Sequence, residues 1–96
     1  MPELTPPANE PRETRLRRLR MRSWRRGTKE MDMILGAFAD HALADLSDPE
    51  LDAHEALMAE NDQDLYLWIS GAKPAPEHLV AAVERVQRFV REINSV

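Results

Sequence analysis

Large apolar residues recur every three or four positions along most of this chain of 96 residues, and this spacing constrains its fold more than any other feature. Such a period places apolar side chains along one face of an α-helix. The strongest stretch contains Met31, Ile34, Leu35, Phe38, Ala42 and Leu46, and the last contains Leu79, Val83, Val86, Val90 and Ile93. The last stretch is typical of a helix that packs along a seam in a bundle. We find no convincing strand.

Local start and stop signals divide the chain into five predicted helices. Two of them occupy residues 12–26 and 28–45, and the others begin near residues 47, 61 and 76. Ser47 and Glu50 have the spacing of a capping box, in which each side chain bonds the backbone N–H of the other residue. Asn61 opens the fourth helix, Gly71 is a natural stop for it, and Pro76 suits the first turn of the fifth.

The predicted fold class is therefore all-α, a small five-helix bundle. Residues 1–11 are rich in proline and poor in large apolar residues, so we expect a disordered tail there. Residues 12–96 form one predicted helical-bundle domain, because a chain of this length has room for one core. Gly36 lies inside the second helix, where it carries a cost, and we expect another helix to cross closely at that point.

Composition excludes several classes of protein. The chain has no cysteine, which excludes disulfides and thiolate chemistry. It has no apolar run near the ~18 residues that a membrane-spanning helix requires. Its first residues lack the basic and apolar blocks of a signal peptide, and they carry too many acids and prolines for an import presequence. We therefore expect a cytoplasmic protein with no membrane partner.

The charges are divided unevenly along the chain. Residues 1–26 carry eight arginines and three acidic residues, whereas residues 27–96 carry five basic and fourteen acidic residues. The basic stretch is either a solvated helix face or an arm for an anionic partner. If the second alternative holds, the chain is a small nucleic-acid-binding or adaptor protein that uses residues 12–26, and this is the runner-up function. The sequence pI near 5.3 argues against binding to nucleic acid.

No combination of residues suggests catalysis. The three histidines, His41, His54 and His78, lie on three different predicted helices, so we expect no metal site. Asp62 and Asp64 suit the first turn of a helix better than a pair of catalytic carboxylates. There is also no glycine-rich phosphate loop. We therefore expect a protein that is not an enzyme and binds no cofactor tightly by itself.

One segment, residues 24–32, gathers an aromatic residue, several charges and a glycine between two helices. Gly27 is placed to act as a helix N-cap, and Glu30 is then placed to bond back to it. This structural interpretation leaves Arg25 and Arg26 unexplained, because the start of a helix is already positive. Their charge suggests that an anionic or carboxylate-bearing partner meets them.

This segment resembles the SdhE family of succinate dehydrogenase assembly factors, also called flavinators. Arg26-Gly27-Thr28-Lys29-Glu30 matches the family's Arg-Gly-x-x-Glu signature. The resemblance extends through Met31-Asp32, Phe38, His41, Leu46-Ser47-Asp48 and Asp62-Gln-Asp-Leu-Tyr-Leu-Trp68, about half the chain. The chain departs from the family pattern at Ala37, where members often have proline, and in its basic stretch before Trp24.

The resemblance implies a five-helix bundle that binds the flavoprotein subunit of succinate dehydrogenase, with that of fumarate reductase as a second candidate. It implies a chaperone-like role in flavinylation, in which the factor holds the partner in the arrangement that allows covalent attachment of FAD. The FAD belongs to the partner. The predicted partner-binding residues are Arg25, Arg26, Gly27, Glu30 and Asp32.

Overall fold

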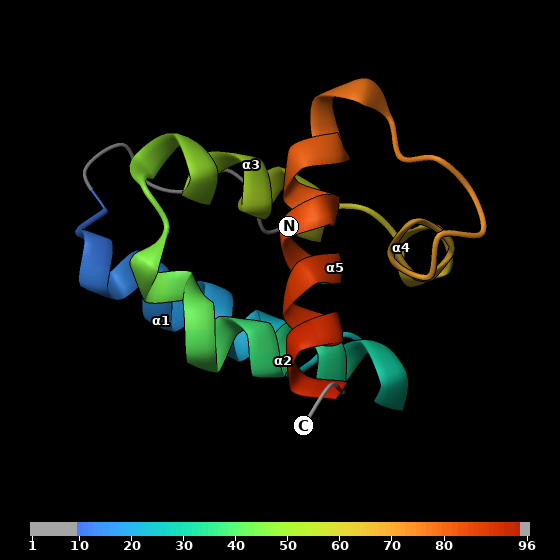
Figure 1. The fold of residues 1–96 in the computed structure, drawn as a ribbon. Helices are drawn as coiled ribbons and strands as arrows, with labels where there is room; N and C mark the ends of the chain where they lie inside the picture. The colour runs from blue at the N-terminus through green and yellow to red at the C-terminus, as the bar shows by residue number, and fades with distance from the viewer. Residues whose placement is uncertain (1–9, 95–96) are drawn as a thin grey trace.

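The computed structural model describes residues 10–94, which fold into five α-helices joined by short connections, with no strand in that range (Figure 1). The helices are α1 (Arg12–Ser23), α2 (Lys29–Ala42), α3 (Asp48–Met58), α4 (Asp62–Ile69) and α5 (Val80–Asn94), with single 3-10 turns η1 (Leu43–Asp45) and η2 (Glu77–Leu79) before α3 and α5. The predicted all-α, five-helix fold is confirmed. None of these helices is long and apolar enough to cross a membrane.

Helix α5 packs against three others and organises the core. In Figure 1 it runs through the middle of the molecule, with α1 and α2 lying across one end and α4 on the opposite side from α1. It contacts α2, α3 and α4, while α1 packs mainly on α2. The seam predicted for α5 is buried at Leu79, Val83 and Val86, whereas Ile93 is exposed because the helix runs past the core. The fully buried core residues include Leu19, Leu35, Phe38, Leu51, Leu57 and Leu65.

The helix ends on the second half of the chain follow the predicted signals. Ser47 Oγ accepts the backbone N–H of Glu50 at 3.2 Å, and the Glu50 carboxylate accepts the N–H of Ser47 at 2.9 Å, so the capping box is confirmed. The Asn61 side chain accepts the N–H of Asp64 at 2.9 Å at the start of α4. Gly71, with φ of +85°, follows the end of α4 as predicted.

The junction of α1 and α2 differs from the prediction. Helix α1 ends at Ser23 rather than at residue 26, and the N-cap of α2 is Thr28 rather than Gly27. The Thr28 hydroxyl accepts the N–H of Met31 at 3.3 Å, while Gly27 has a φ of +108° and reverses the chain before the cap. Glu30 is therefore the second residue of α2 and does not bond back to a cap. The capping role predicted for Gly27 and Glu30 is wrong.

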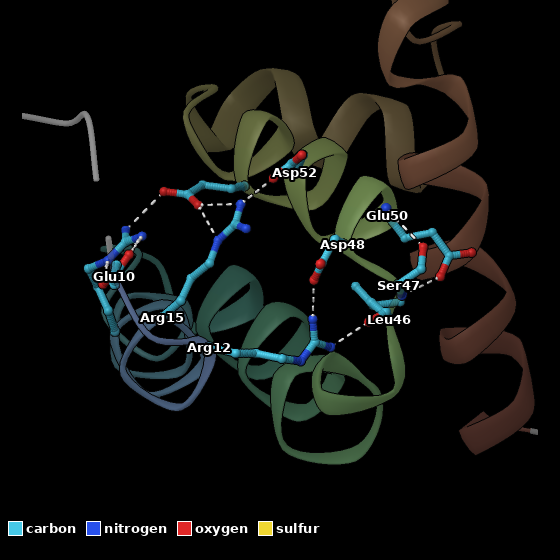
Figure 2. Close-up of polar contacts among 10 residues, drawn as sticks. Glu10, Arg12, Arg15, Leu46, Ser47, Asp48, Glu50 and Asp52 are labelled. Atoms are coloured by element: carbon cyan, nitrogen blue, oxygen red, sulfur yellow. Dashed lines mark hydrogen bonds and ion pairs between the residues drawn. The ribbon is translucent and has the colours of Figure 1, made fainter. Parts of the chain in front are cut away.

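Arginines of α1 join that helix to α3 through a row of ion pairs (Figure 2). The pairs are Arg12–Asp48 (2.6 Å), Arg15–Asp52 (2.7 Å), Arg15–Glu55 (3.0 Å) and Arg18–Glu55 (2.9 Å). Exposed pairs of this kind contribute about 0–1 kcal/mol each, but Arg15 and Glu55 are mostly buried and share a network. The arginines on one face of the basic stretch thus bind acids within the fold instead of facing solvent.

The folded part of the chain begins before the predicted boundary at residue 12. The Glu10 carboxylate accepts two hydrogen bonds from the Arg18 guanidinium, both at 2.9 Å, and its side chain is only 7% exposed. These bonds hold the pKa of Glu10 below its ordinary value. Pro11 is the N-cap of α1. The last two residues of the predicted tail therefore belong to the domain, and residues 1–9 lie outside the described part of the chain.

His54 is the least expected core residue. Its ring is fully buried on α3 and stacks on Phe38 with 4.9 Å between the ring centres. Neither ring nitrogen has a hydrogen-bond partner within residues 10–94. Burial, reinforced by the positive charges of Arg85 and Arg26, lowers the pKa of His54 to about 4. The imidazole is therefore neutral in the folded protein at neutral pH.

Because of His54, we expect the protein to lose stability in mildly acidic solution. Above pH 6.5 the imidazole is neutral in both folded and unfolded chains, so its free-energy contribution does not change with pH. As the pH falls from 6.5 to 4, the His54 imidazole binds a proton in the unfolded chain but stays neutral in the folded chain. This difference lowers the free energy of unfolding by roughly 3 kcal/mol in all. Urea denaturation at several pH values measures this loss.

The matched control is His54→Leu, which keeps an apolar side chain against Phe38 and cannot be protonated. The variant should keep a flatter stability profile between pH 6.5 and 4.5 than the parent. Parallel profiles for the two proteins over this range would show that His54 is not the group responsible.

Candidate partner-binding site

The Arg26 side chain joins the α1–α2 turn to α3 and α4. Its guanidinium donates to the carbonyl oxygens of Met58 at 2.6 Å and of Glu60 at 2.7 Å, and to the Asp62 carboxylate at 2.9 Å. Met58 is the last residue of α3, where carbonyl oxygens lack intrahelical donors, and Glu60 lies in the connection from α3 to α4. The cation also lies at the negative end of the α3 dipole. The Arg26 side chain is 10% exposed and that of Asp62 is 15% exposed.

Asp32 holds the same turn from the other side. Its carboxylate accepts the backbone N–H of Arg26, although Asp32 lies one turn into α2. Arg26 and Asp32 are thus both used within the chain, which differs from their prediction as surface residues that bind a partner. The sequence contains one relevant signal, the acidic residue Asp62, but its position in the first turn of α4 and in the run that resembles the family does not indicate a bond to Arg26.

Glu30, Gly27 and Arg25 remain at the surface beside this fixed turn. Within residues 10–94 the Glu30 carboxylate makes no hydrogen bond or ion pair. A Cβ added at Gly27 would meet nothing within 4 Å, so that position leaves open space for an approaching backbone. These three exposed residues thus lie within six positions of the chain, and the bonds of Arg26 and Asp32 hold the backbone of that segment.

Glu30 borders a groove of about 540 Å³ between the start of α2 and α4. We call it the motif groove, and its lining residues are Thr28, Glu30, Met31, Asp62, Gln63, Tyr66 and Leu67. Tyr66 is 50% exposed, whereas Met31 is buried. The groove therefore combines an apolar base with a hydroxyl, an amide and the free carboxylate of Glu30 at its edge. This composition suits recognition of another surface.

Trp24 lies next to the motif, and its indole is the reason that position 36 requires a glycine. A Cβ added at Gly36 would lie 2.3 Å from the Trp24 indole, which is closer than real side-chain contacts allow. The close neighbour predicted at Gly36 is therefore this aromatic side chain of the preceding turn, and the predicted helix crossing is wrong. The indole N–H points to the Asp40 carboxylate at 3.4 Å, and the side chain remains 42% exposed.

The other aromatic and titratable residues are dispersed. Trp68 is partly buried against the core, so only Tyr66 faces the motif groove. His41 is on α2, His54 on α3 and His78 in η2. In the part of the chain that the structure describes, no group of three or more metal-ligating side chains could hold an ion.

The family model and the curated relatives that match this chain indicate the same family. A family model described as a flavinator of succinate dehydrogenase matches residues 17–93. The chain is 41% identical over 68 residues to succinate dehydrogenase assembly factor 2, mitochondrial, of Mycosarcoma maydis, which covers 71% of this chain and 29% of that protein. It is 36% identical over 102 residues to assembly factor 2-A, mitochondrial, of Drosophila persimilis, covering 93% of this chain and 64% of that protein. The chain thus spans less than two thirds of the length of either relative.

These relatives contradict the expected cytoplasmic location. Both carry "mitochondrial" in their names, as does the assembly factor 2 of Drosophila grimshawi, which is 32% identical over 99 residues and is matched by all of this chain. The prediction rested on the lack of a targeting segment among the first residues. The absence of such a segment does not determine the compartment, and the cytoplasmic prediction is wrong.

Replacing Arg26 by lysine should destabilise the fold. A lysine presents one compact ammonium and cannot bond two carbonyl oxygens and a carboxylate in the fork geometry of arginine. Losing bonds to buried or partly buried acceptors should lower the free energy of unfolding by roughly 2 kcal/mol. Urea denaturation of the full chain measures this change.

Arg25→Lys is the matched control, because Arg25 is the exposed neighbour in the same turn. It should change stability by less than about 0.5 kcal/mol. Equal stabilities for the two variants would mean that the Arg26 network contributes nothing to folding.

Proposed function

This chain belongs to the family of succinate dehydrogenase flavinators, and we propose that it binds the flavoprotein subunit of succinate dehydrogenase and promotes covalent attachment of that subunit's FAD. The flavoprotein of fumarate reductase is a second candidate partner. The proposed role is that of an assembly factor without catalysis of its own.

The observation that carries this proposal is the exposed Glu30 carboxylate. It stands on the first turn of α2, at the edge of the motif groove, and nothing within the described chain uses it. A carboxylate without an internal partner gains most from a donor on another molecule. Its backbone is held by the bonds of Arg26 and Asp32, so little conformational freedom is lost when a partner docks.

Gly27 and Arg25 complete the proposed contact surface. Gly27 has no side chain to obstruct a partner's backbone, and its positive φ is the reason that the chain turns there. Arg25 is exposed and supplies a cation on the other side of the turn from Glu30. A surface with one charge of each sign recognises a complementary pair and disfavours other pairings. Arg26 and Asp32 act in this proposal as positioning residues.

The factor would act on the partner's conformation. Binding to the arrangement in which the partner's nucleophile lies against FAD increases the populated fraction of that arrangement. A rigid helical bundle suits this role, because it keeps its own shape while favouring one shape of the partner. We propose that FAD remains bound to the partner and that this chain has no tight FAD site of its own.

The test is Glu30→Ala. Because Glu30 makes no cap and no ion pair within the described chain, the variant should lose less than about 1 kcal/mol of stability, mainly from the helix dipole. Flavinylation of the partner should nevertheless fall clearly. The assay is in-gel flavin fluorescence of the denatured flavoprotein subunit, since covalent flavin survives denaturation, paired with a thermal melt of each variant.

Glu13→Ala is the matched control, because Glu13 is an exposed acid in the first turn of α1. It should leave both readouts near those of the parent. Gly27→Ala should add strain of roughly 1 kcal/mol and also reduce flavinylation. A folded Glu30→Ala variant that supports full flavinylation would refute the proposed role of this residue.

A further inference from the structure

A second hollow, of about 640 Å³, lies on the other side of the α1–α2 turn. It is bordered by α1 and by the end of α3, and we call it the basic groove. Its principal lining residues are Arg17, Arg18, Met21, Arg22, Arg25 and Glu60. The proposed function assigns a role only to Arg25 among them.

The arginines of α1 and of the turn after it include two distinct sets. Arg12, Arg15 and Arg18 form ion pairs with acids within the chain. Arg17, Arg22 and Arg25, in contrast, make no ion pair or side-chain hydrogen bond within residues 10–94, although all three line the basic groove. Cations gathered in one hollow repel one another and attract anions. The position of Arg22 in the last turn of α1 favours a cation there, but this dipole effect also applies to Arg20, which lies outside the groove.

An apolar side chain accompanies these charges. Met21 is 49% exposed and lies among the arginines of the groove. A flexible thioether adapts to apolar side chains of different shapes. The groove therefore offers sites for carboxylates around a site for an apolar side chain.

We propose that the basic groove binds an acidic segment of the flavoprotein partner, with two or more carboxylates on the arginines and an apolar side chain on Met21. This inference rests on the proposed function and extends its contact surface. Guanidinium groups bind carboxylates through paired hydrogen bonds. Arg25 and Arg26 line the basic groove, while Thr28 and Glu30 line the motif groove, so the two hollows flank one turn and a single partner surface can cover both.

The groove suits a protein segment better than a nucleic acid. The Glu60 carboxylate lines it, and the carbonyl end of α3 lies beside it. Both are negative and oppose a continuous row of phosphates, whereas separate carboxylates can avoid them. The chain as a whole also carries a net charge of −4.

The experiment reverses charges in the groove without altering the motif. The variant is Arg17→Glu with Arg22→Glu, and the matched control is Arg20→Glu with Arg88→Glu, which makes the same change in charge at exposed positions outside the groove. The probe is the flavoprotein subunit of succinate dehydrogenase purified without covalent flavin. Calorimetry at about 50 mM and about 300 mM salt measures its affinity for each protein, and circular dichroism checks the helix content.

We expect the groove variant to bind at least about tenfold more weakly than the parent at low salt, and the control to stay within about threefold. The affinity of the groove variant should also depend less on salt. If charge reversal perturbs folding, the milder variant Arg17→Ala with Arg22→Ala replaces it, and this variant should also bind the subunit more weakly than the parent. Equal affinities for groove variant and control would overturn the inference while leaving the proposed function intact.

Two further outcomes would also overturn it. If the parent fails to bind the subunit, the proposed function itself fails, and that result is visible without any variant. If the parent binds arbitrary duplex DNA with a steep salt dependence that only the groove variant loses, the groove serves a nucleic acid.

Discussion

The bonds of the Arg26 guanidinium fix the end of the molecule where the α1–α2 turn meets α3 and α4. They join the turn before α2 to the last carbonyl of α3, to the α3–α4 connection and to the first residue of α4. A lone buried cation would be costly, but here the Asp62 carboxylate and two backbone acceptors compensate it. Because the turn is fixed from the inside, Gly27 and Glu30 project outward at a constant position. In our proposal, the signature arginine supports the contact surface and its glutamate belongs to that surface.

The arginines of the basic stretch differ in whether the fold uses them. Successive positions along a helix face different directions. Arginines three positions apart therefore turn toward α3 and find acids there (Figure 2). Arg17 and Arg20, which lie between and after them, are exposed. The paired set holds α1 in place, and the set without internal partners lies beside the turn that Arg26 fixes. Part of the charge asymmetry in the sequence therefore serves internal assembly, and the rest leaves cations at the surface, where we propose that a partner binds.

Much of the fold could be predicted from the sequence because its signals are local. Apolar periodicity, the Ser47–Glu50 box and Gly71 each act within a few residues, and the resemblance of residues 26–30 to a family was specific enough to be confirmed. Contacts between distant segments were not predictable. The Arg26–Asp62 pair spans 36 positions, and nothing local reveals it. The Trp24 indole over Gly36 and the buried His54 depend on packing in the same way.

The central claim is that the partner covers the α1–α2 turn and the start of α4. Hydrogen–deuterium exchange of the full chain, with and without the flavoprotein subunit, tests it most directly. We expect slower exchange on binding in residues 24–31 and 62–67, with little change in residues 77–90, which form η2 and the first part of α5. Protection confined to α5, with unchanged exchange in residues 24–31, would contradict it.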